Sequence, residues 1–268
     1  MLDAFDNPVI RDVLSALNNA MEKQDPTSIL AQFHEDCHWR DLIAFTWNIK
    51  AMSGKEAIKE MLDAQLSRIA PRGFVHDTSR PSGEDDGVTS AWLIFETNVA
   101  LGEAHFRIRD GKILTLFTAV SALRNHPEPE GTNRPLGANH SSGGDQRTWK
   151  ERRDAEVSEL GYSKQPYVMV IGGGQGGIAL GARLRQHGVP TLIVERNPRA
   201  GDSWRNRYKS LCLHDPVWYD HLPYLKFPSN WPVFSPKDKI ADWLEMYVKV
   251  MELNYWTSST VNGAVYDE

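Results

Sequence analysis

This chain has few cysteines, no long apolar run and no excess of basic residues. Its 268 residues include two cysteines, Cys37 and Cys212, which stand far apart and outside any CxxC pair. This arrangement argues against a disulfide scaffold, and no histidine pair has the spacing of a metal-ligand motif. No apolar run approaches about eighteen residues and no basic-then-apolar leader is present, so we expect a reducing, cytoplasmic setting without secretion.

The charge of the chain argues against a further class of partner. It has 30 Lys and Arg against 35 Asp and Glu, a formal net charge of −5, and the two signs are interspersed. Nucleic-acid binding needs a basic patch that neutralises backbone phosphates. We therefore expect a small-molecule substrate, with no nucleic acid, no membrane and no metal ion as partners.

A glycine-rich segment is the most informative feature that is present. Residues 167–171 form a continuous apolar run, typical of a parallel strand buried on both faces, and residues 172–177 then read Gly-Gly-Gly-Gln-Gly-Gly. Gly172 permits a tight turn, Gly174 lets the backbone approach a pyrophosphate, and Gly177 lets the next helix pack closely. Amide groups at that helix start favour phosphates. The pattern predicts a dinucleotide-binding turn rather than a merely flexible one.

An acidic residue follows at the matching distance. A predicted helix over about 175–186 and a predicted strand over 191–194 lead to Glu195, which comes 195 − 172 = 23 positions after Gly172. At about this spacing a carboxylate meets a ribose hydroxyl and disfavours a 2′-phosphate. NAD and FAD both use such a turn, so these residues predict a dinucleotide without choosing between the two.

Beyond Glu195 the chain resembles the flavin-containing monooxygenases, especially their YUCCA-type and fungal members. The likeness spans about residues 167–268 and includes Gly201-Asp202-Ser203-Trp204, where the family has Gly-Gly-x-Trp, and the segments 211–216, 222–224 and 231–238. Asp202 departs from the family pattern. The resemblance implies FAD as the cofactor, held by Gly172, Gly174, Gln175, Gly176, Gly177, Glu195, Arg196, Gly201, Asp202, Ser203 and Trp204.

The resemblance also implies a reaction in which NADPH reduces FAD and one oxygen atom of O₂ is transferred to a small organic substrate. No second glycine-rich turn for NADPH follows Glu195, and only about three strands can be assembled from residue 167 onward. We therefore predict an incomplete α/β Rossmann-type FAD-binding domain with an unpaired sheet edge and an exposed apolar face. We expect a fragment, a truncated gene product or a subunit, with a homo-oligomeric or complementing chain at that edge.

The N-terminal part has a different pattern. Helical periodicity covers about residues 9–21, 29–33 and 54–66, and capping-box sequences begin at Ser53 and, further on, at Thr148. Strand patterns follow between residues 88 and 123, with Asp110-Gly111 as a hairpin signal. This order resembles the SnoaL-like α+β cone. We predict the cone over residues 1–124, a linker and connecting helix over 125–160, and the Rossmann-type domain over 161–268.

Two candidate catalytic residues lie outside the predicted cofactor set. Asp41 belongs to the cone, where strand alternation places it with Trp39 and away from His38. It has no visible partner at catalytic spacing. His214 lies in the segment that runs near the flavin in the resembling family, and a hydrogen-bonded structural role is as well supported. Two other functions stay open: an isomerase, cyclase or dehydratase in the cone with a vestigial flavin half-domain, or a non-catalytic partner subunit.

Overall fold

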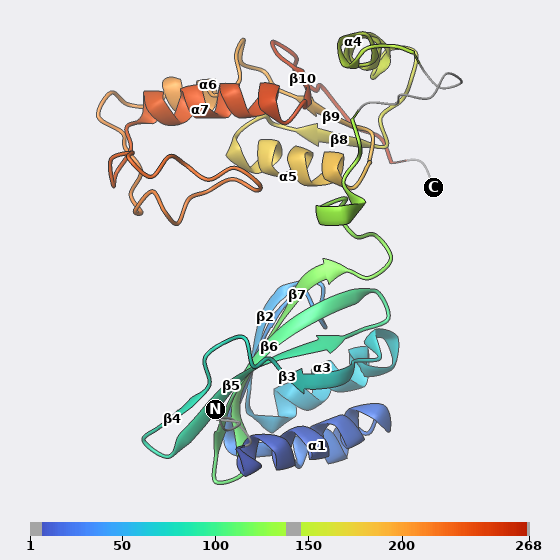
Figure 1. Cartoon of the computed structure of the whole chain (residues 1–268), viewed down its shortest axis with the longest axis vertical. Helices are drawn as coiled ribbons and strands as arrows, with labels where there is room; N and C mark the ends of the chain where they lie inside the picture. Colours follow the sequence, from blue (N-terminus) through green and yellow to red (C-terminus); the bar gives the residue numbers. More distant parts are fainter. Residues whose placement is uncertain (1–6, 138–145, 267–268) are drawn as a thin grey trace. The chain divides into compact units, whose positions relative to one another are not determined.

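The computed structural model describes residues 7–137 and 146–266, and the chain divides into two compact units, Met1–Pro127 and Glu128–Glu268 (Figure 1). The boundary between the units falls within the segment expected to be a linker. The Ser-Gly-rich part of that segment, residues 138–145, lies outside the described residues.

The first unit is a seven-stranded sheet with α1 and α3 on one side (Figure 1). The strand order is β2-β1-β7-β6-β5-β3, and β4 pairs with β5; β1 and β7 run parallel and the other pairs antiparallel. The elements are α1 (Pro8–Glu22), α2 (Pro26–Leu30), β1 (Phe33–Leu42), β2 (Ile49–Ser53), α3 (Gly54–Ile69), β3 (Arg72–His76), β4 (Gly83–Asp85), β5 (Val88–Glu96), β6 (Ala100–Arg109) and β7 (Lys112–Leu123).

The core of this unit follows the predicted alternation. In β1, Trp39 and Asp41 are buried while His38 is exposed, so His38 and Asp41 lie on opposite faces as expected. The hairpin prediction is also confirmed, because Asp110 and Gly111 have φ of 50° and 69° and connect β6 directly to β7. The largest fully buried side chains of this unit are aromatic: Trp39, Phe33, Phe45, Phe74 and Phe106.

Two predicted local features of this unit are wrong. The helix expected over about residues 29–33 is α2 at Pro26–Leu30, and Phe33 already belongs to β1. Ser53 precedes α3 as expected, but its side chain makes no capping hydrogen bond. Its Oγ instead lies 3.1 Å from Nδ1 of His38 on the neighbouring strand β1. The cross-strand contact therefore competes successfully with the local cap. At Thr148, where no strand neighbour intervenes, the capping box with Glu151 is present.

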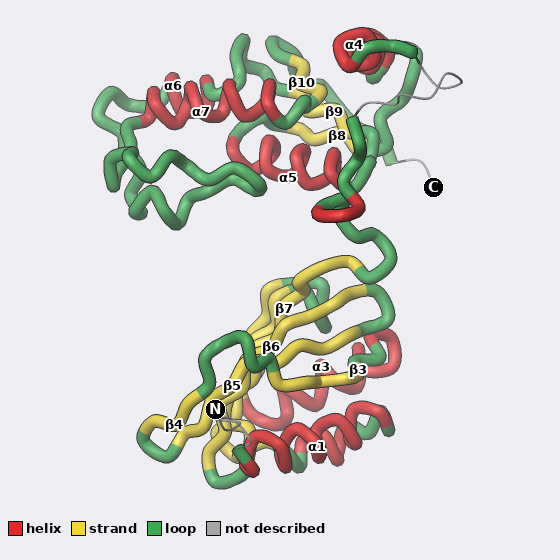
Figure 2. Tube along the Cα trace, viewed as in Figure 1, coloured by secondary structure: helices red, strands yellow, loops and turns green. Residues whose placement is uncertain are grey.

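The second unit is built on a parallel sheet of three strands in the order β10-β9-β8 (Figure 2). Its core includes Val170, Ile178, Ile193, Leu244 and Tyr247. None of the described helices is long and apolar enough to cross a membrane. The elements are η1 (Gly131–Asn133), α4 (Trp149–Glu159), β8 (Val168–Ile171), α5 (Gln175–Gln186), β9 (Thr191–Val194), α6 (Asp202–Arg205), α7 (Lys237–Val250) and β10 (Asn254–Trp256).

β8 is an edge strand. The prediction that residues 167–171 are buried on both faces is wrong, because Tyr167, Met169 and Ile171 are 85%, 49% and 67% exposed while Val170 is 8% exposed. The physical reason is that β8 pairs only with β9 and that one face of it has no covering layer among the described residues. The predicted unpaired edge and exposed apolar face are thereby confirmed for this part of the chain.

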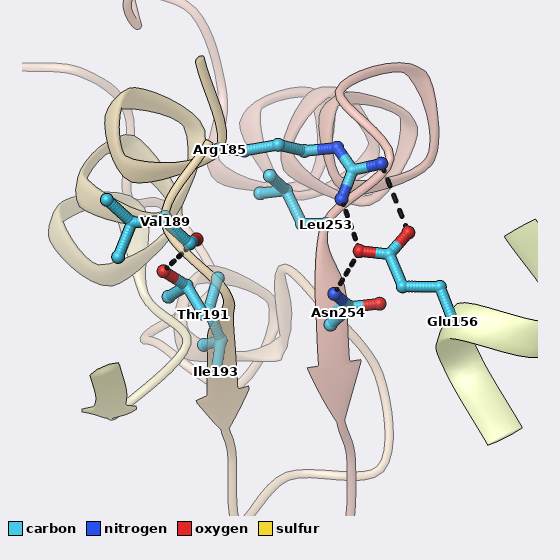
Figure 3. Close-up of a pocket in the computed structure, with 8 residues that line it drawn as sticks. Glu156, Arg185, Val189, Thr191, Ile193, Leu253 and Asn254 are labelled. Atoms are coloured by element: carbon cyan, nitrogen blue, oxygen red, sulfur yellow. Dashed lines mark hydrogen bonds and ion pairs between the residues drawn. The ribbon is translucent and has the colours of Figure 1, made fainter. Parts of the chain in front are cut away.

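α4 is attached to the second unit by polar contacts and buries none of its own residues. Glu156 accepts hydrogen bonds from Arg185 of α5 (2.8 and 3.2 Å) and from Asn254 of β10 (2.9 Å), around a cavity of about 20 Å³ (Figure 3). Arg153 of α4 also donates to Glu156 and to Asn254, at 2.8 and 2.6 Å. A helix without an apolar face is thus held by one dense ion-pair network.

Candidate functional site

The glycine-rich turn joins β8 to α5. Gly172 has φ of +100°, a conformation that favours glycine, and its amide donates to the Val194 carbonyl at 2.9 Å, which ties the turn to β9. A Cβ on Gly177 would stand 2.0 Å from the carbonyl oxygen of Gly172. Only glycine therefore lets α5 begin so close to the turn.

The first amide groups of α5 have no protein acceptors. Within the described ranges, the N–H groups of Gly174, Gln175 and Gly176 donate to no backbone or side-chain atom. A helix start leaves such donors available, and with the helix dipole they favour a negatively charged group. An added Cβ at Gly176 would meet nothing within 4 Å, so the approach is open. The turn has the properties of a phosphate-binding site.

Glu195 stands directly after β9 and is 6% exposed. Its Oε2 accepts a hydrogen bond from the Gly173 amide at 2.7 Å. Its Oε1 accepts from the backbone amide and from Nδ2 of Asn197, at 2.9 and 2.6 Å. These bonds fix the carboxylate beside the glycine turn. Oε2 has room for one further donor, such as a hydroxyl group of a ligand.

An open cavity of about 580 Å³, called cavity A, adjoins the turn and Glu195. The Oγ of Ser203 is buried there and has no hydrogen-bond partner among residues 7–137 and 146–266; it lies 3.8 Å from the position of a Cβ on Gly174. An unpaired buried hydroxyl costs about 1 to 3 kcal/mol, so a ligand that pairs it is favoured. The lining residues are Ile171, Gly172, Val194, Glu195, Arg196, Asn197, Asp202, Ser203, Asn206, Arg207, Ser259, Thr260 and Val261.

A second open cavity of about 540 Å³, called cavity B, begins at the same turn. Trp204 and Gln175 both line it, and Nε1 of Trp204 donates to Oε1 of Gln175 at 3.0 Å. Arg207 lines both cavities. The other lining residues are Gly176, Ala179, Leu211, Cys212, Leu213, His214, Asp215, Asp220, His221, Leu222, Pro223, Phe227, Ile240 and Leu244.

Two neighbouring arginines have different surroundings. Arg205 forms ion pairs with Asp202, Asp242 and Glu245 at distances between 2.7 and 3.0 Å. Arg207 is exposed and, in the described part of the chain, its side chain makes no hydrogen bond or ion pair. Arg205 therefore stabilises the fold around α6, whereas the guanidinium of Arg207 is available to a ligand at the junction of the two cavities.

The segment that departs from the family pattern has a packing role. Gly201 has φ of +87°, and a Cβ there would lie 2.2 Å from the carbonyl oxygen of Ala241, so it allows close contact with α7 and does not line cavity A. Asp202 lines cavity A, but its carboxylate already accepts from the Arg199 amide at 3.1 Å and from Arg205. Gly201 and Asp202 therefore act on the site indirectly, by holding the start of helix α6 in place.

Asp41 lies outside these cavities, in the first unit, and is fully buried. Its carboxylate accepts hydrogen bonds from the backbone amides of Phe45 and Thr46 and from the hydroxyls of Thr46 and Thr118, at 2.7 to 3.1 Å. These bonds hold the loop 43–48 that joins β1 to β2. The surroundings of Asp41 are those of a structural carboxylate whose acceptor sites are filled by the protein.

His214 is exposed on the wall of cavity B, next to the exposed Asp215. Burial and the nearby Asp215 raise the pKa of Asp220 on the same wall. Among the described residues, no group of three or more His, Cys, Asp or Glu side chains is arranged to hold a metal ion. His214 thus lies on the wall of cavity B, and no hydrogen bond from its ring to another described residue marks it as a base.

The sequence patterns did not identify Asn197 and Tyr255 as parts of this site. Asn197 follows Glu195 by two positions, and this local spacing was a usable signal for a side-chain turn. Tyr255 lies 82 positions from Gly173, whose carbonyl it contacts through its hydroxyl. No local pattern reports such a contact, because it depends on β10 lying in the same sheet as β8.

Two family models match parts of the chain. Residues 14–115 match the SnoaL-like domain, and residues 170–230 match the NAD(P)-binding Rossmann-like domain. An uncharacterized CzcO-like oxidoreductase of Geobacillus kaustophilus is 43% identical over 86 residues, which is 32% of this chain and 25% of that protein. Indole-3-pyruvate monooxygenase YUCCA1 of Oryza sativa subsp. japonica is 32% identical over 124 residues, 46% of this chain and 29% of the relative.

Solved structures show partial similarity to each part. A flavin monooxygenase mutant from Stenotrophomonas maltophilia is 27% identical, with a TM-score of 0.32, over 34% of this chain and 27% of that one. A cystatin-like protein from Nostoc punctiforme is 20% identical, with a TM-score of 0.34, over 45% of this chain and 94% of that one.

The chain spans about a quarter of the length of the curated relatives, 25% and 29% for the two named above. Taken together, the turn, its two cavities and the family matches identify the components of the molecule. The chain contains a SnoaL-like domain and an NAD(P)-binding Rossmann-like domain, and its sequence relatives include proteins named as YUCCA monooxygenases.

Proposed function

We propose that the second unit binds FAD at the glycine turn, with the adenosine part in cavity A and the flavin part towards cavity B. The observation that carries the proposal is the set of unpaired donors at the turn: the amides of Gly174, Gln175 and Gly176, and the buried hydroxyl of Ser203. Such donors match a pyrophosphate, which brings negative charge and acceptor oxygens. The resemblance of residues 167–268 to the flavin-containing monooxygenases, together with sequence relatives named as monooxygenases, favours FAD over NAD.

In this proposal each residue has a defined task. Glu195 accepts a ribose hydroxyl at Oε2, where one acceptor site remains. The turn amides and Ser203 bind the phosphates, and Arg207 adds a positive charge at the junction of the cavities. Trp204 and Gln175 are hydrogen-bonded to each other at the start of cavity B and form part of its wall.

We further propose that the chain is the FAD-binding portion of an NADPH-using monooxygenase that acts on a small organic molecule. Bound FAD would supply the electron transfer and oxygen chemistry. The residues of this chain would bind and orient the cofactor and exclude water from it. Support comes from the sequence relatives, whose printed names include indole-3-pyruvate monooxygenase, and from the turn itself.

The test is a titration of the purified full chain with FAD, followed by absorbance and by isothermal calorimetry. We expect one FAD per chain for the parent and at least about tenfold weaker binding for Gly174→Asp, since a carboxylate near a phosphate costs about 1 to 4 kcal/mol at about 4 Å. The variant should fold, because its Cβ would meet only Ser203 Oγ at 3.8 Å.

Gly83→Asp is the matched control, since it adds the same charge in the first unit, where a Cβ meets nothing within 4 Å. It should bind FAD like the parent. Parallel titrations with NAD⁺ and NADPH show which dinucleotide the turn prefers. A folded parent that binds no FAD, or a Gly174→Asp variant that binds it equally well, would contradict the proposal.

A further inference from the structure

Tyr255 connects the far strand of the sheet to the glycine turn. It lies in the middle of β10, paired with Ile193 of β9, and its hydroxyl donates a hydrogen bond to the carbonyl oxygen of Gly173 at 2.8 Å. β9 separates β10 from β8, so the side chain reaches past one strand to contact the turn after β8. The contact joins residues that are 82 positions apart.

The peptide units on both sides of Gly173 are held by side chains. The Gly173 amide donates to Oε2 of Glu195 at 2.7 Å, and its carbonyl accepts from Tyr255. A Cβ on Gly173 would stand 1.9 Å from the Tyr255 hydroxyl oxygen. Gly173 is not one of the three glycines of the GxGxxG pattern, so this contact, rather than the nucleotide motif, accounts for glycine at this position.

The direction of the Gly174 amide follows from this arrangement. The peptide bond between Gly173 and Gly174 is planar and, like every described peptide bond, it is not cis. In a trans peptide the carbonyl and the following N–H point in opposite directions. Because Tyr255 fixes the Gly173 carbonyl, it also fixes the Gly174 N–H, which is one of the unpaired donors of the turn.

The Tyr255 hydroxyl stays protonated and therefore remains a donor. Burial raises the pKa of Tyr255 above its usual range, and the carboxylates of Glu195 and Asp202 raise the pKa further. The donor role is thus stable at neutral and moderately alkaline pH. Glu195 also contacts Gly173 directly, so one carboxylate and one phenol act on the same glycine from two directions.

We propose that Tyr255 is a positioning residue that aims the Gly174 amide at a phosphate group of the bound dinucleotide, an inference that rests on the proposed FAD site. The hydroxyl makes no contact with the ligand in this proposal. It acts through the Gly173 carbonyl and sets the geometry of the turn before the ligand arrives, which lowers the cost of binding.

The test compares Tyr255→Phe with the parent in the full chain. Loss of one hydrogen bond of ordinary strength should weaken FAD binding roughly 2- to 12-fold in a calorimetric titration. In the ligand-free protein, the amide resonance of Gly174 should shift, because its peptide plane is no longer held. Tyr208→Phe is the matched control, since Tyr208 is 58% exposed and should change neither result.

A second variant covers the case in which Tyr255→Phe folds poorly. Gly173→Ala places a methyl group against the Tyr255 hydroxyl and should weaken FAD binding in the same direction, with a normal circular dichroism spectrum. A purely structural role would lower the melting temperature and leave FAD affinity unchanged.

The outcomes separate this inference from the proposed function. A parent that binds FAD while Tyr255→Phe binds it equally well, with an unmoved Gly174 resonance, overturns only the role of Tyr255. A folded parent that binds no FAD overturns both. Weaker binding together with a shifted Gly174 resonance supports both.

Discussion

Asp41 and Glu195 are both buried carboxylates with several hydrogen bonds, yet they suit different roles. Asp41 accepts from Phe45 and Thr46 of the 43–48 loop. It also accepts from Thr118, whose hydroxyl itself accepts from Trp39 Nε1 at 2.9 Å. Glu195 borders cavity A and keeps one acceptor site open on Oε2. The number of acceptor sites filled by the protein thus separates a structural carboxylate from one that can bind a ligand.

The role of Asp41 gives a stability prediction. Asp41→Asn replaces one acceptor oxygen by an NH₂ group that faces hydrogen-bond donors, so we expect a loss of about 1 to 3 kcal/mol in the free energy of unfolding of the first unit. Urea denaturation of the full chain, followed by tryptophan fluorescence, measures it. FAD binding should not change.

Asp85→Asn serves as the comparison for that measurement, because Asp85 is an exposed residue of β4. Its effect should stay within about 0.5 kcal/mol. If Asp41→Asn is as stable as Asp85→Asn, the hydrogen bonds to Asp41 do not hold the 43–48 loop.

At the scale of elements, α4 shows how a helix can be fixed without an apolar face. Glu156 is the centre of the network in Figure 3, and it is partly buried between α5 and β10. Burial raises the pKa of Glu156, but hydrogen bonds from Arg185, Asn254 and Arg153 outweigh it and lower the pKa from 4.5 to about 2. The charged form is therefore favoured in the folded chain.

The sign of the pH dependence follows from this lowered pKa. A carboxyl group whose pKa is lower in the folded state contributes stability above its unfolded pKa, and this contribution is lost as the pH falls through the folded pKa. Glu156→Gln should therefore lower the melting temperature at pH 7, and the difference from the parent should shrink as the pH falls from 4.5 towards about 2.

Glu159→Gln is the control for the pH series, since within the described part of the chain the Glu159 carboxylate of α4 pairs only with Lys164, at the surface. We expect little change in melting temperature for this variant at any pH. A Glu156→Gln effect of the same size at every pH would show that the charge of Glu156 is not what anchors α4.

At the scale of the whole molecule, the free edge of β8 is the feature with the widest consequence. Its backbone groups face away from β9, and Met169 and Ile171 form an exposed apolar strip beside them. Exposed edges of this kind favour pairing with another chain. The expectation of a homo-oligomeric or complementing partner at this edge stays a prediction.

Self-association through this edge can be measured directly. We expect the purified full chain to associate with rising concentration in sedimentation velocity experiments, and Met169→Lys to reduce that association, because a charge on an exposed edge strand opposes pairing. Ile94→Lys changes a residue of the first unit that is 51% exposed, close to the 49% of Met169, and should leave the association unchanged. Equal association of all three proteins would argue against the β8 edge.

The local elements and the glycine motif could be predicted from the amino-acid sequence alone. Apolar runs, glycines and turn residues act over a few positions, so the α5 helix, the β9 strand, the hairpin at Asp110-Gly111 and the capping box at Thr148 were predictable. The same holds for the glycine turn and for Glu195, whose spacing depends only on one strand, one helix and one further strand.

Which hydrogen-bonding groups have protein partners and which remain available to a ligand depends on the tertiary structure. Several features depend on residues that are distant in the chain. They are the exposure of β8, the contact of Ser53 with His38, the hydrogen bond from Thr118 to Asp41, the unpaired Ser203 hydroxyl and the hydrogen bond from Tyr255 to Gly173. Sequence periodicity predicts on which face of a helix or strand a side chain lies, but not which residue it contacts there. The sheet brings those partners together, and their hydrogen bonds decide where a ligand can still bind.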